Sequence, residues 1–289
     1  PKEHIDTIEP HRLLFHKSND GSKPMPHAFI DNVETDERNS MDEREALGLL
    51  ASDLPHAGDD AAVVGSTAIT TDMLHETTDF PVGTTRYTAG WRSVGASLSD
   101  IAAMGADPTA AVAAYADTSF VAAELRAFIK GAQDVCAAVD TEYVGGDLDN
   151  HSEFTVTTTA IGEVEKPVYR SGATVGDVVC VTGTLGRSAA ALELFEQEET
   201  EQANELFQFL PRVEIGRRLA STATSMMDSS DGLARSLHQL ATASDCGFEI
   251  DSSAVPIDPA VAAVIDESDR WEAGVHFGED FELVCTLPR

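Results

Sequence analysis

Two patterns of apolar and polar residues alternate along most of the chain. Runs rich in Val, Ile and Thr predict strands, and Ala-rich segments with apolar residues three or four positions apart predict amphipathic helices. This predicts a mixed α/β or α+β protein and excludes an all-β one. Strands are predicted at 61–71, 109–115, 142–144, 154–164, 178–182, 225–227, 247–250 and 281–287. Helices are predicted at 42–50, 86–105, 121–139, 186–197, 200–209, 212–221, 232–244 and 258–267.

Two segments without a regular pattern divide the chain. Residues 1–40 show little periodicity, so we expect a poorly ordered extension there. Residues 165–176 contain Pro167 and two glycines, which makes them the best candidate for an internal boundary. We therefore expect an N-terminal domain at 41–168 and a C-terminal domain at 169–289.

The chain of 289 residues is strongly acidic, with 50 Asp and Glu against 19 Lys and Arg and a net charge of -31. This charge argues against binding to nucleic acid or to an anionic membrane surface. After residue 40 the only lysines are Lys130 and Lys166. Such a lysine-poor, acidic composition resembles that of proteins from halophilic organisms. In molar salt the Debye length shrinks to about 3 Å, so the charges repel one another only weakly.

Neither the cysteine spacing nor the length of the apolar runs indicates a secreted or membrane-spanning protein. Cys136, Cys180, Cys246 and Cys285 stand far apart, without the spacing of a zinc or redox motif. No apolar stretch approaches the roughly 18 residues of a membrane span, and none has the form of a secretory signal. We expect a soluble, cytoplasmic protein with reduced thiols.

Asp100 stands out within the predicted helix 86–105. It is the only charged residue between Arg92 and Asp107, and it shares a helix face with small residues such as Ser93 and Ser97. In so acidic a protein, a solvated face is expected to carry many acids. This face is therefore predicted to pack against another element; the alternative is a single Asp in contact with solvent.

Other acids stand beside Gly, Ser or Thr at the predicted ends of strands and helices. Each has an ordinary alternative, a turn or a helix cap. Together they supply the carboxylate and hydroxyl oxygens that Mg²⁺ prefers, and the phosphates of a nucleotide would complete the coordination. The runs are GDDAAV (58–63), TTD (70–72), GGD (145–147), DSSDG (228–232) and GED (278–280).

Several common nucleotide motifs are missing from the sequence. It has no G-x-x-x-x-G-K-[ST] loop and none of the lysine and H-R-D signals of protein kinases. TGTLG (182–186) has no third glycine in place, which disfavours a dinucleotide site. Phosphate groups would therefore be neutralised mainly by metal ions.

These runs, in this order, resemble the thiamine-monophosphate kinase family from residue 41 to the C-terminus. The resemblance implies the two-domain fold of the aminoimidazole ribotide synthetase-like superfamily, with an N-terminal domain that forms a dimeric β-barrel. It also implies ATP and thiamine monophosphate as substrates, several Mg²⁺ ions and a homodimer. The family resemblance rests further on the runs TTDML (70–74), SVGASLSDIAAMGADP (93–108), RSGATVGD (170–177), VTGTLG (181–186), DSSDGL (228–233) and GEDFEL (278–283).

The resemblance implies roles for individual residues. The implied Mg²⁺ ligands are Asp60, Thr70, Thr71, Asp72, Asp100, Asp147, Asp228 and Asp231, of which Asp100, Asp147 and Asp231 matter most for catalysis. The implied ATP contacts are Gly146, Asp147, Arg170 and Ser230. Asp79 and Glu279 are the implied thiamine-phosphate contacts, although many relatives have His at the position of Asp79.

Two features depart from the family. Residues 1–40 lie outside the resemblance. The family also continues beyond the last predicted strand, with a segment that places an aromatic residue over the thiamine. We therefore expect an incomplete C-terminal domain without that aromatic wall.

The implied reaction is direct in-line transfer of the γ-phosphoryl group of ATP to the phosphate of thiamine monophosphate. A phosphate monoester has a second pKa of about 6, so at neutral pH the acceptor needs no general base. Catalysis would rest on positioning and charge neutralisation. Two alternatives stay open: a sister-family enzyme with another acceptor, similar to aminoimidazole ribotide synthetase, and a truncated, non-catalytic protein that binds Mg-nucleotide.

Overall fold

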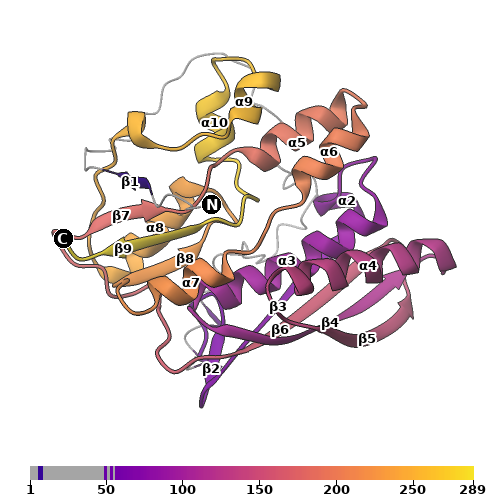
Figure 1. The fold of residues 1–289 in the computed structure, drawn as a ribbon, viewed down its shortest axis with the longest axis horizontal. Helices are drawn as coiled ribbons and strands as arrows, with labels where there is room; N and C mark the ends of the chain where they lie inside the picture. The colour runs from indigo at the N-terminus through magenta and orange to yellow at the C-terminus, as the bar shows by residue number, and fades with distance from the viewer. Residues whose placement is uncertain (1–5, 9–48, 51–52, 55) are drawn as a thin grey trace, which may run out of the picture.

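The computed structural model describes residues 6–8, 49–50, 53–54 and 56–289. Within this part, residues 62–163 form a five-stranded sheet with two long helices on one face (Figure 1). Strands β4 and β5 are parallel, and the other neighbours are antiparallel. The sheet order is β2 (Ala62–Val64), β3 (Thr67–His75), β6 (Thr155–Glu163), β4 (Asp107–Asp117) and β5 (Tyr143–Asn150). The helices are α3 (Arg86–Ala103) and α4 (Ala122–Ala138), with the short α2 (Glu76–Asp79) after β3.

The core of this first unit lies between α3, α4 and the sheet. Val94, Leu98 and Ile101 of α3 are fully buried and form the apolar stripe that the sequence predicts. The two helices approach closely at Gly131, where a Cβ would lie 2.0 Å from the carbonyl oxygen of Tyr87. Glycine is needed there because any side chain would push the helices apart.

The second unit is a four-stranded antiparallel sheet with its helices packed around it. The order is β1 (Asp6–Ile8), β7 (Val178–Val181), β9 (Leu283–Leu287) and β8 (Ser225–Asp228), so three residues of the predicted extension pair with β7. Within the described part of the chain, none of the helices is both long and apolar enough to cross a membrane. The helices are α5 (Arg187–Glu196), α6 (Thr200–Phe207), α7 (Val213–Leu219), α8 (Leu233–Ser244), η1 (Ser252–Ala254), α9 (Pro259–Val264) and α10 (Arg270–Val275).

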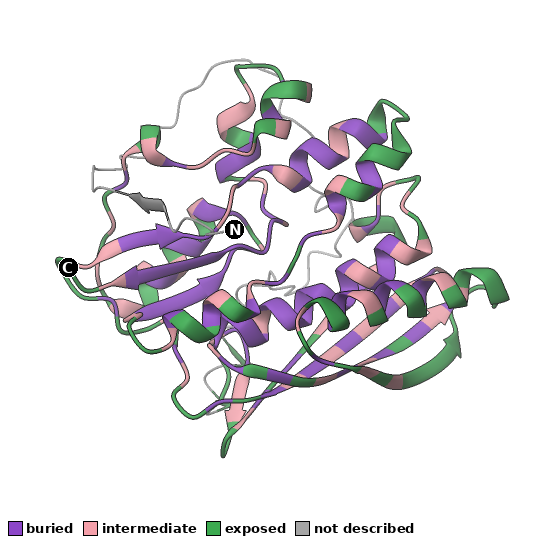
Figure 2. Cartoon of the chain, in the orientation of Figure 1, coloured by how far each residue is buried: buried purple, intermediate pink, exposed green. Residues whose placement is uncertain are grey.

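The C-terminal end of α3 joins the two units. Ala102 and Ala103 belong to one apolar cluster with Met226 of β8 and Leu283 of β9. Figure 2 shows α3 as a mostly buried helix. Asp100, in the last turn of α3, therefore lies at the junction of the two units.

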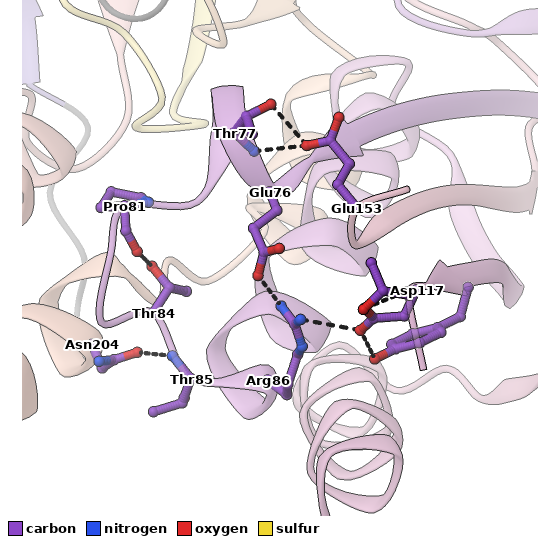
Figure 3. A network of polar contacts seen from close by, with 11 residues as sticks. Glu76, Thr77, Pro81, Thr84, Thr85, Arg86, Asp117, Glu153 and Asn204 are labelled. Carbon is purple, nitrogen blue, oxygen red and sulfur yellow. Dashed lines mark hydrogen bonds and ion pairs between the residues drawn. The ribbon is translucent and has the colours of Figure 1, made fainter. Parts of the chain in front are cut away.

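Polar contacts fix the start of α3 (Figure 3). Thr85 caps the helix by accepting a hydrogen bond from the Thr88 N–H, and its own N–H donates to Asn204 of α6 at 2.9 Å. Arg86 pairs with Glu76 and with Asp117, each at 3.1 Å. The helix is thus held in place at its first turn by both units.

The structure corrects several sequence predictions. The strand predicted at 61–71 is a hairpin, because Gly65 adopts a left-handed φ of 66° and turns β2 back onto β3. β5 is longer than predicted, because the two glycines of the GGD run continue the strand. Residues 247–250 contain only a single bridge residue, and α2 and α10 are additional elements. Residues 49–50 at the end of the helix predicted at 42–50 are helical, and the rest of that helix lies outside the described residues, as does nearly all of the extension predicted at 1–40.

Candidate active site

Three carboxylates from distant parts of the chain meet at the junction of the two units. Asp60 precedes β2, Asp100 lies in the last turn of α3, and Asp228 ends β8. One carboxylate oxygen of each lies within 4.8 Å of those of the other two. The first unit supplies two of these residues and the second supplies one, so the cluster depends on the packing of both. We call Asp60, Asp100 and Asp228 the carboxylate cluster.

Hydroxyl groups orient two members of the carboxylate cluster. Thr70 Oγ1 on β3 donates to Asp100 Oδ2 at 2.5 Å. Ser99 Oγ on α3 donates to Asp228 Oδ2 at 2.7 Å. Because Ser99 and Asp228 belong to different units, this hydrogen bond holds the cluster together across the junction.

A fourth aspartate, Asp72, lies on β3 beside the carboxylate cluster. It accepts a hydrogen bond from Ser97 Oγ at 2.5 Å, and that hydroxyl also contacts Thr158 Oγ1 of β6 at 2.7 Å. Thr158 in turn donates to the Ser93 carbonyl at 3.0 Å. The small-residue face of α3 thus packs against the sheet, which confirms the prediction made from the isolated charge of Asp100.

Arg170 faces the carboxylate cluster from the segment that connects the two units. Its guanidinium donates to Asp60 Oδ1 at 2.9 Å, and its backbone N–H donates to Asp59 Oδ1 at 2.7 Å. Burial lowers the pKa of Arg170, but the charge of Asp60 and this hydrogen bond outweigh burial and raise it above its ordinary value. The arginine therefore stays charged and compensates part of the negative charge.

The crowding of carboxylates shifts their protonation equilibria. Burial, followed by the charge of Asp72, raises the pKa of Asp100 well above its ordinary value. Burial and the charge of Asp60 raise the pKa of Asp228 to about 8, although the Ser99 hydroxyl opposes the shift. Arg170 alone therefore does not compensate the negative charge that these acids would carry if all of them were ionised.

The donor set of the carboxylate cluster fits Mg²⁺. Its ligand atoms are carboxylate oxygens, with the hydroxyl of Thr70 beside them and neither sulfur nor imidazole among them. Hard divalent cations prefer such oxygen ligands. A divalent cation would also relieve the repulsion that raises the pKa values of these acids.

A second set of charged residues lies around Glu279, which precedes β9. Its carboxylate accepts a hydrogen bond from the buried guanidinium of Arg92 on α3 at 2.5 Å. Burial raises the pKa of Glu279, the charge of Arg92 opposes this, and the nearby charges of Asp79 and Asp231 raise it further. Asp79 and Glu279, the two predicted substrate contacts, thus lie close enough to interact electrostatically.

Asp147 and Gly146 lie on β5, outside the carboxylate cluster. Asp147 is exposed and pairs with Ala114 of β4, which is also exposed. Gly146 pairs with the buried Ala113, and a Cβ on it would lie 1.7 Å from the Ala113 carbonyl oxygen. Close strand pairing therefore requires this glycine whether or not a ligand binds there.

Three further predicted residues lie outside the carboxylate cluster. Thr71 is exposed on β3 and donates to the Thr158 carbonyl at 2.8 Å. The carbonyl of Ser230 accepts a 2.6 Å hydrogen bond from the Glu279 N–H. Asp231 is exposed and pairs with Arg235 at 3.1 Å. The loop after β8 thus connects the carboxylate cluster to the surroundings of Glu279.

Sequence reasoning missed Arg92, Asp59 and the hydroxyls of Ser97 and Ser99. A signal for Arg92 existed, since it is the only basic residue between Tyr87 and Ala103, among mostly apolar and small residues. The serines gave no such signal, because small residues on a helix face are ordinary packing residues. Their roles depend on which strands lie opposite α3.

The fold and site place the chain in the class of AIR synthase related proteins. The sequence family "AIR synthase related protein, N-terminal domain" matches residues 58–164. The family "AIR synthase related protein, C-terminal domain" matches residues 174–288. Thiamine-monophosphate kinase of Halobacterium salinarum is 64% identical over 248 residues, which cover 86% of this chain and 85% of the relative. The chain belongs to the thiamine-monophosphate kinase family.

Solved structures agree with this assignment. The crystal structure of thiamine-monophosphate kinase from Stenotrophomonas maltophilia has a TM-score of 0.72 and 30% identity, over 84% of this chain and 83% of that one. A ThiL structure complexed with AMPPCP and TMP has a TM-score of 0.79 and 27% identity, over 85% of each chain. The two-domain fold expected from the sequence is thus confirmed.

Proposed function

We propose that this protein transfers the γ-phosphoryl group of ATP to thiamine monophosphate and so forms thiamine diphosphate. The observation that carries the proposal is the carboxylate cluster, which brings three acids from both units within 4.8 Å of one another. Its oxygen ligands suit the metal complex of a triphosphate. The relative from Halobacterium salinarum, at 64% identity, supports thiamine monophosphate as the acceptor.

In this proposal Asp60, Asp100 and Asp228 hold Mg²⁺, with Asp72 and Thr70 beside them. Bound Mg²⁺ would neutralise charge on the phosphates as the phosphoryl group moves. Arg170 lies against Asp60 and would contact ATP together with Ser230. Thr71, Gly146, Asp147 and Asp231 keep the metal and nucleotide roles that the family resemblance implies.

The acceptor side would be formed by Asp79 and Glu279. These acids suit the positively charged thiazolium ring of thiamine, and their position at the α3 junction places them in both units. The phosphate of the acceptor has a second pKa of about 6, so transfer at neutral pH needs no general base. We therefore propose direct in-line transfer, with positioning and charge neutralisation as the main catalytic effects.

We also propose a homodimer formed through the five-stranded sheet. The helices α3 and α4 cover one face of this sheet, and no other described element covers the opposite face (Figure 1). That face carries the exposed side chains of Val64, Ile69 and Met73. An exposed apolar face of this kind favours contact with a second copy of the chain.

A cytoplasmic location accompanies the proposal. The substrate ATP is a cytoplasmic metabolite, and all four cysteines are free thiols. Free cysteines are typical of a reducing compartment.

The experiment is a kinase assay in concentrated KCl with ATP, Mg²⁺ and thiamine monophosphate, in which thiamine diphosphate is separated and measured. We expect product with wild type and a loss of turnover of about 100-fold or more with Asp100→Asn, at an unchanged circular dichroism spectrum. Aminoimidazole precursors serve as the alternative acceptor. Product with those precursors only, or heat of Mg-ATP binding without any turnover, contradicts the proposal.

A further inference from the structure

Arg92 is a buried arginine that connects α3 of the first unit to the loop before β9 in the second. Its exposed fraction is 1%, and its guanidinium stacks on the Phe207 ring with 3.6 Å between Cζ and the ring centroid. A buried cation requires several partners, because each unpaired N–H group would lose its hydration without replacement. The identity of those partners indicates what the arginine does.

The partners of Arg92 converge on Glu279. The guanidinium donates to the Glu279 carboxylate at 2.5 Å and to the Glu279 carbonyl at 3.2 Å. A further N–H donates to the Phe207 carbonyl at 2.7 Å. Ser188 Oγ donates to the same Glu279 carbonyl at 2.6 Å. Arg92 therefore fixes both the backbone and the side chain of Glu279.

Glu279 needs this support because its backbone is unusual. Its φ is 62°, and Phe281 has a φ of 54°, so two non-glycine residues of this loop are left-handed. Such residues persist where surrounding contacts fix them, and they concentrate at ligand sites. Further contacts hold the loop: the N–H groups of Glu279 and Phe281 donate to the carbonyls of Ser230 and Ser229.

We propose that Arg92 is a positioning residue that holds the Glu279 carboxylate toward the acceptor and makes binding of thiamine monophosphate depend on contact between the two units. This deepens the proposed function and rests on it. Lysine would keep the charge but cannot stack on Phe207 and donate to three separate oxygens at once. The guanidinium, and not the charge alone, is therefore required.

The test is steady-state kinetics of Arg92→Lys with both substrates varied. We expect the KM for thiamine monophosphate to rise about tenfold while the KM for ATP stays within about twofold. Glu279→Gln should raise the same KM, and the double variant should add little to either single variant, because both remove one interaction. The control is Arg187→Lys, because the side-chain hydrogen bonds of Arg187 go to the backbone carbonyls of Leu206, Glu205 and Gln208 and not to the 278–281 loop.

The possible outcomes separate this inference from the proposed function. A wild type without turnover of thiamine monophosphate overturns both. If wild type is active, three results would overturn the positioning role alone. These are an unchanged KM for thiamine monophosphate in Arg92→Lys, an equal rise in both KM values, and additive effects in the double variant. If Arg92→Lys does not fold, Ser188→Ala, which removes the other donor to the Glu279 carbonyl, takes its place. A rise of about threefold in that KM supports the role, and no rise overturns it.

Discussion

The hydroxyl of Ser99 donates a 2.7 Å hydrogen bond to the carboxylate of Asp228. Ser99 lies on α3 of the first unit and Asp228 ends β8 of the second, so this bond crosses the junction directly beside Asp100. The carboxylate cluster is consequently a property of the packed pair of units. It also places repelling charges at the contact that holds the units together.

We expect Asp228→Asn to raise the stability of the metal-free protein and to lower both the stabilisation by Mg²⁺ and the turnover. The amide keeps an acceptor for Ser99 and removes an acid whose raised pKa of about 8 destabilises the folded state at neutral pH, so the melting temperature in EDTA should rise by a few degrees. The increase that Mg²⁺ causes in wild type should largely disappear, and turnover should fall by about 100-fold or more. Thermal melts with EDTA and with Mg²⁺, together with the kinase assay, measure both effects. The control Asp140→Asn changes an exposed acid with a left-handed φ that asparagine tolerates. An equal response of both variants to Mg²⁺ contradicts the proposed metal site.

The buried carboxyl of Asp280 should make stability depend on pH. It accepts hydrogen bonds from the Gly186 and Ser188 N–H groups at 2.5 and 3.0 Å, yet burial raises its pKa from 3.8 to about 7. Between these values the folded state binds more protons than the unfolded state, so the free energy of unfolding falls as pH rises toward about 7 and is level above it.

Asp280→Asn lacks this titration. The free energy of unfolding of wild type minus that of the variant should therefore fall with pH, by at most about 1.4 kcal/mol per unit. The carboxylate cluster is present in both proteins and cancels in the difference. Denaturant titrations at several pH values in EDTA and concentrated KCl measure it. A difference that stays constant from about pH 4 to about 7 removes the basis of the prediction.

Stability should depend strongly on salt. With a net charge of -31, the chain repels itself once the Debye length grows from about 3 Å in molar salt to about 10 Å at 0.1 M. We expect the melting temperature to fall by about 10 °C or more on this dilution, since many weak repulsions add. The melting temperature of the double variant Glu196→Gln, Glu201→Gln, which removes exposed acids at the end of α5 and the start of α6, should fall less. A melting temperature that does not respond to KCl disagrees with this account of the acidic composition.

Met73→Glu should break the proposed dimer. Met73 is 61% exposed on the open face of the five-stranded sheet, and a charge there would have to be desolvated in a dimer interface. Light scattering after size exclusion should give twice the mass of one chain for wild type and one chain mass for the variant. Val175→Glu is the matched control, because Val175 is 97% exposed in the segment between the units. A wild type that is monomeric at all concentrations contradicts the proposal directly.

The sequence alone determined the alternation of elements, the packed small-residue face around Asp100 and the family. These follow from local periodicity and from unusual residues in ordinary surroundings, both of which a linear chain displays. Only the tertiary structure decided which acids meet. Asp60 and Asp147 both end a short run that begins with glycine next to a predicted strand, yet only Asp60 joins the carboxylate cluster.

Two features of the five-stranded sheet keep Asp147 away from the carboxylate cluster. β5 is the edge strand, separated from β3 by β6 and β4, and the register between β4 and β5 also turns Asp147 to the open face. Ala111 pairs with Tyr143 but Val112 pairs with Gly145, so Val144 is an additional residue in β5. A shift of one residue moves every later side chain to the opposite face of a sheet, and Asp147 therefore pairs with the exposed Ala114 and not with the buried Tyr115. Arg92 illustrates the same limit, since its partner Glu279 is 187 residues away along the chain. Residue types and spacing determined which groups are available, while strand register and the packing of α3 between the two sheets determined which of them lie together.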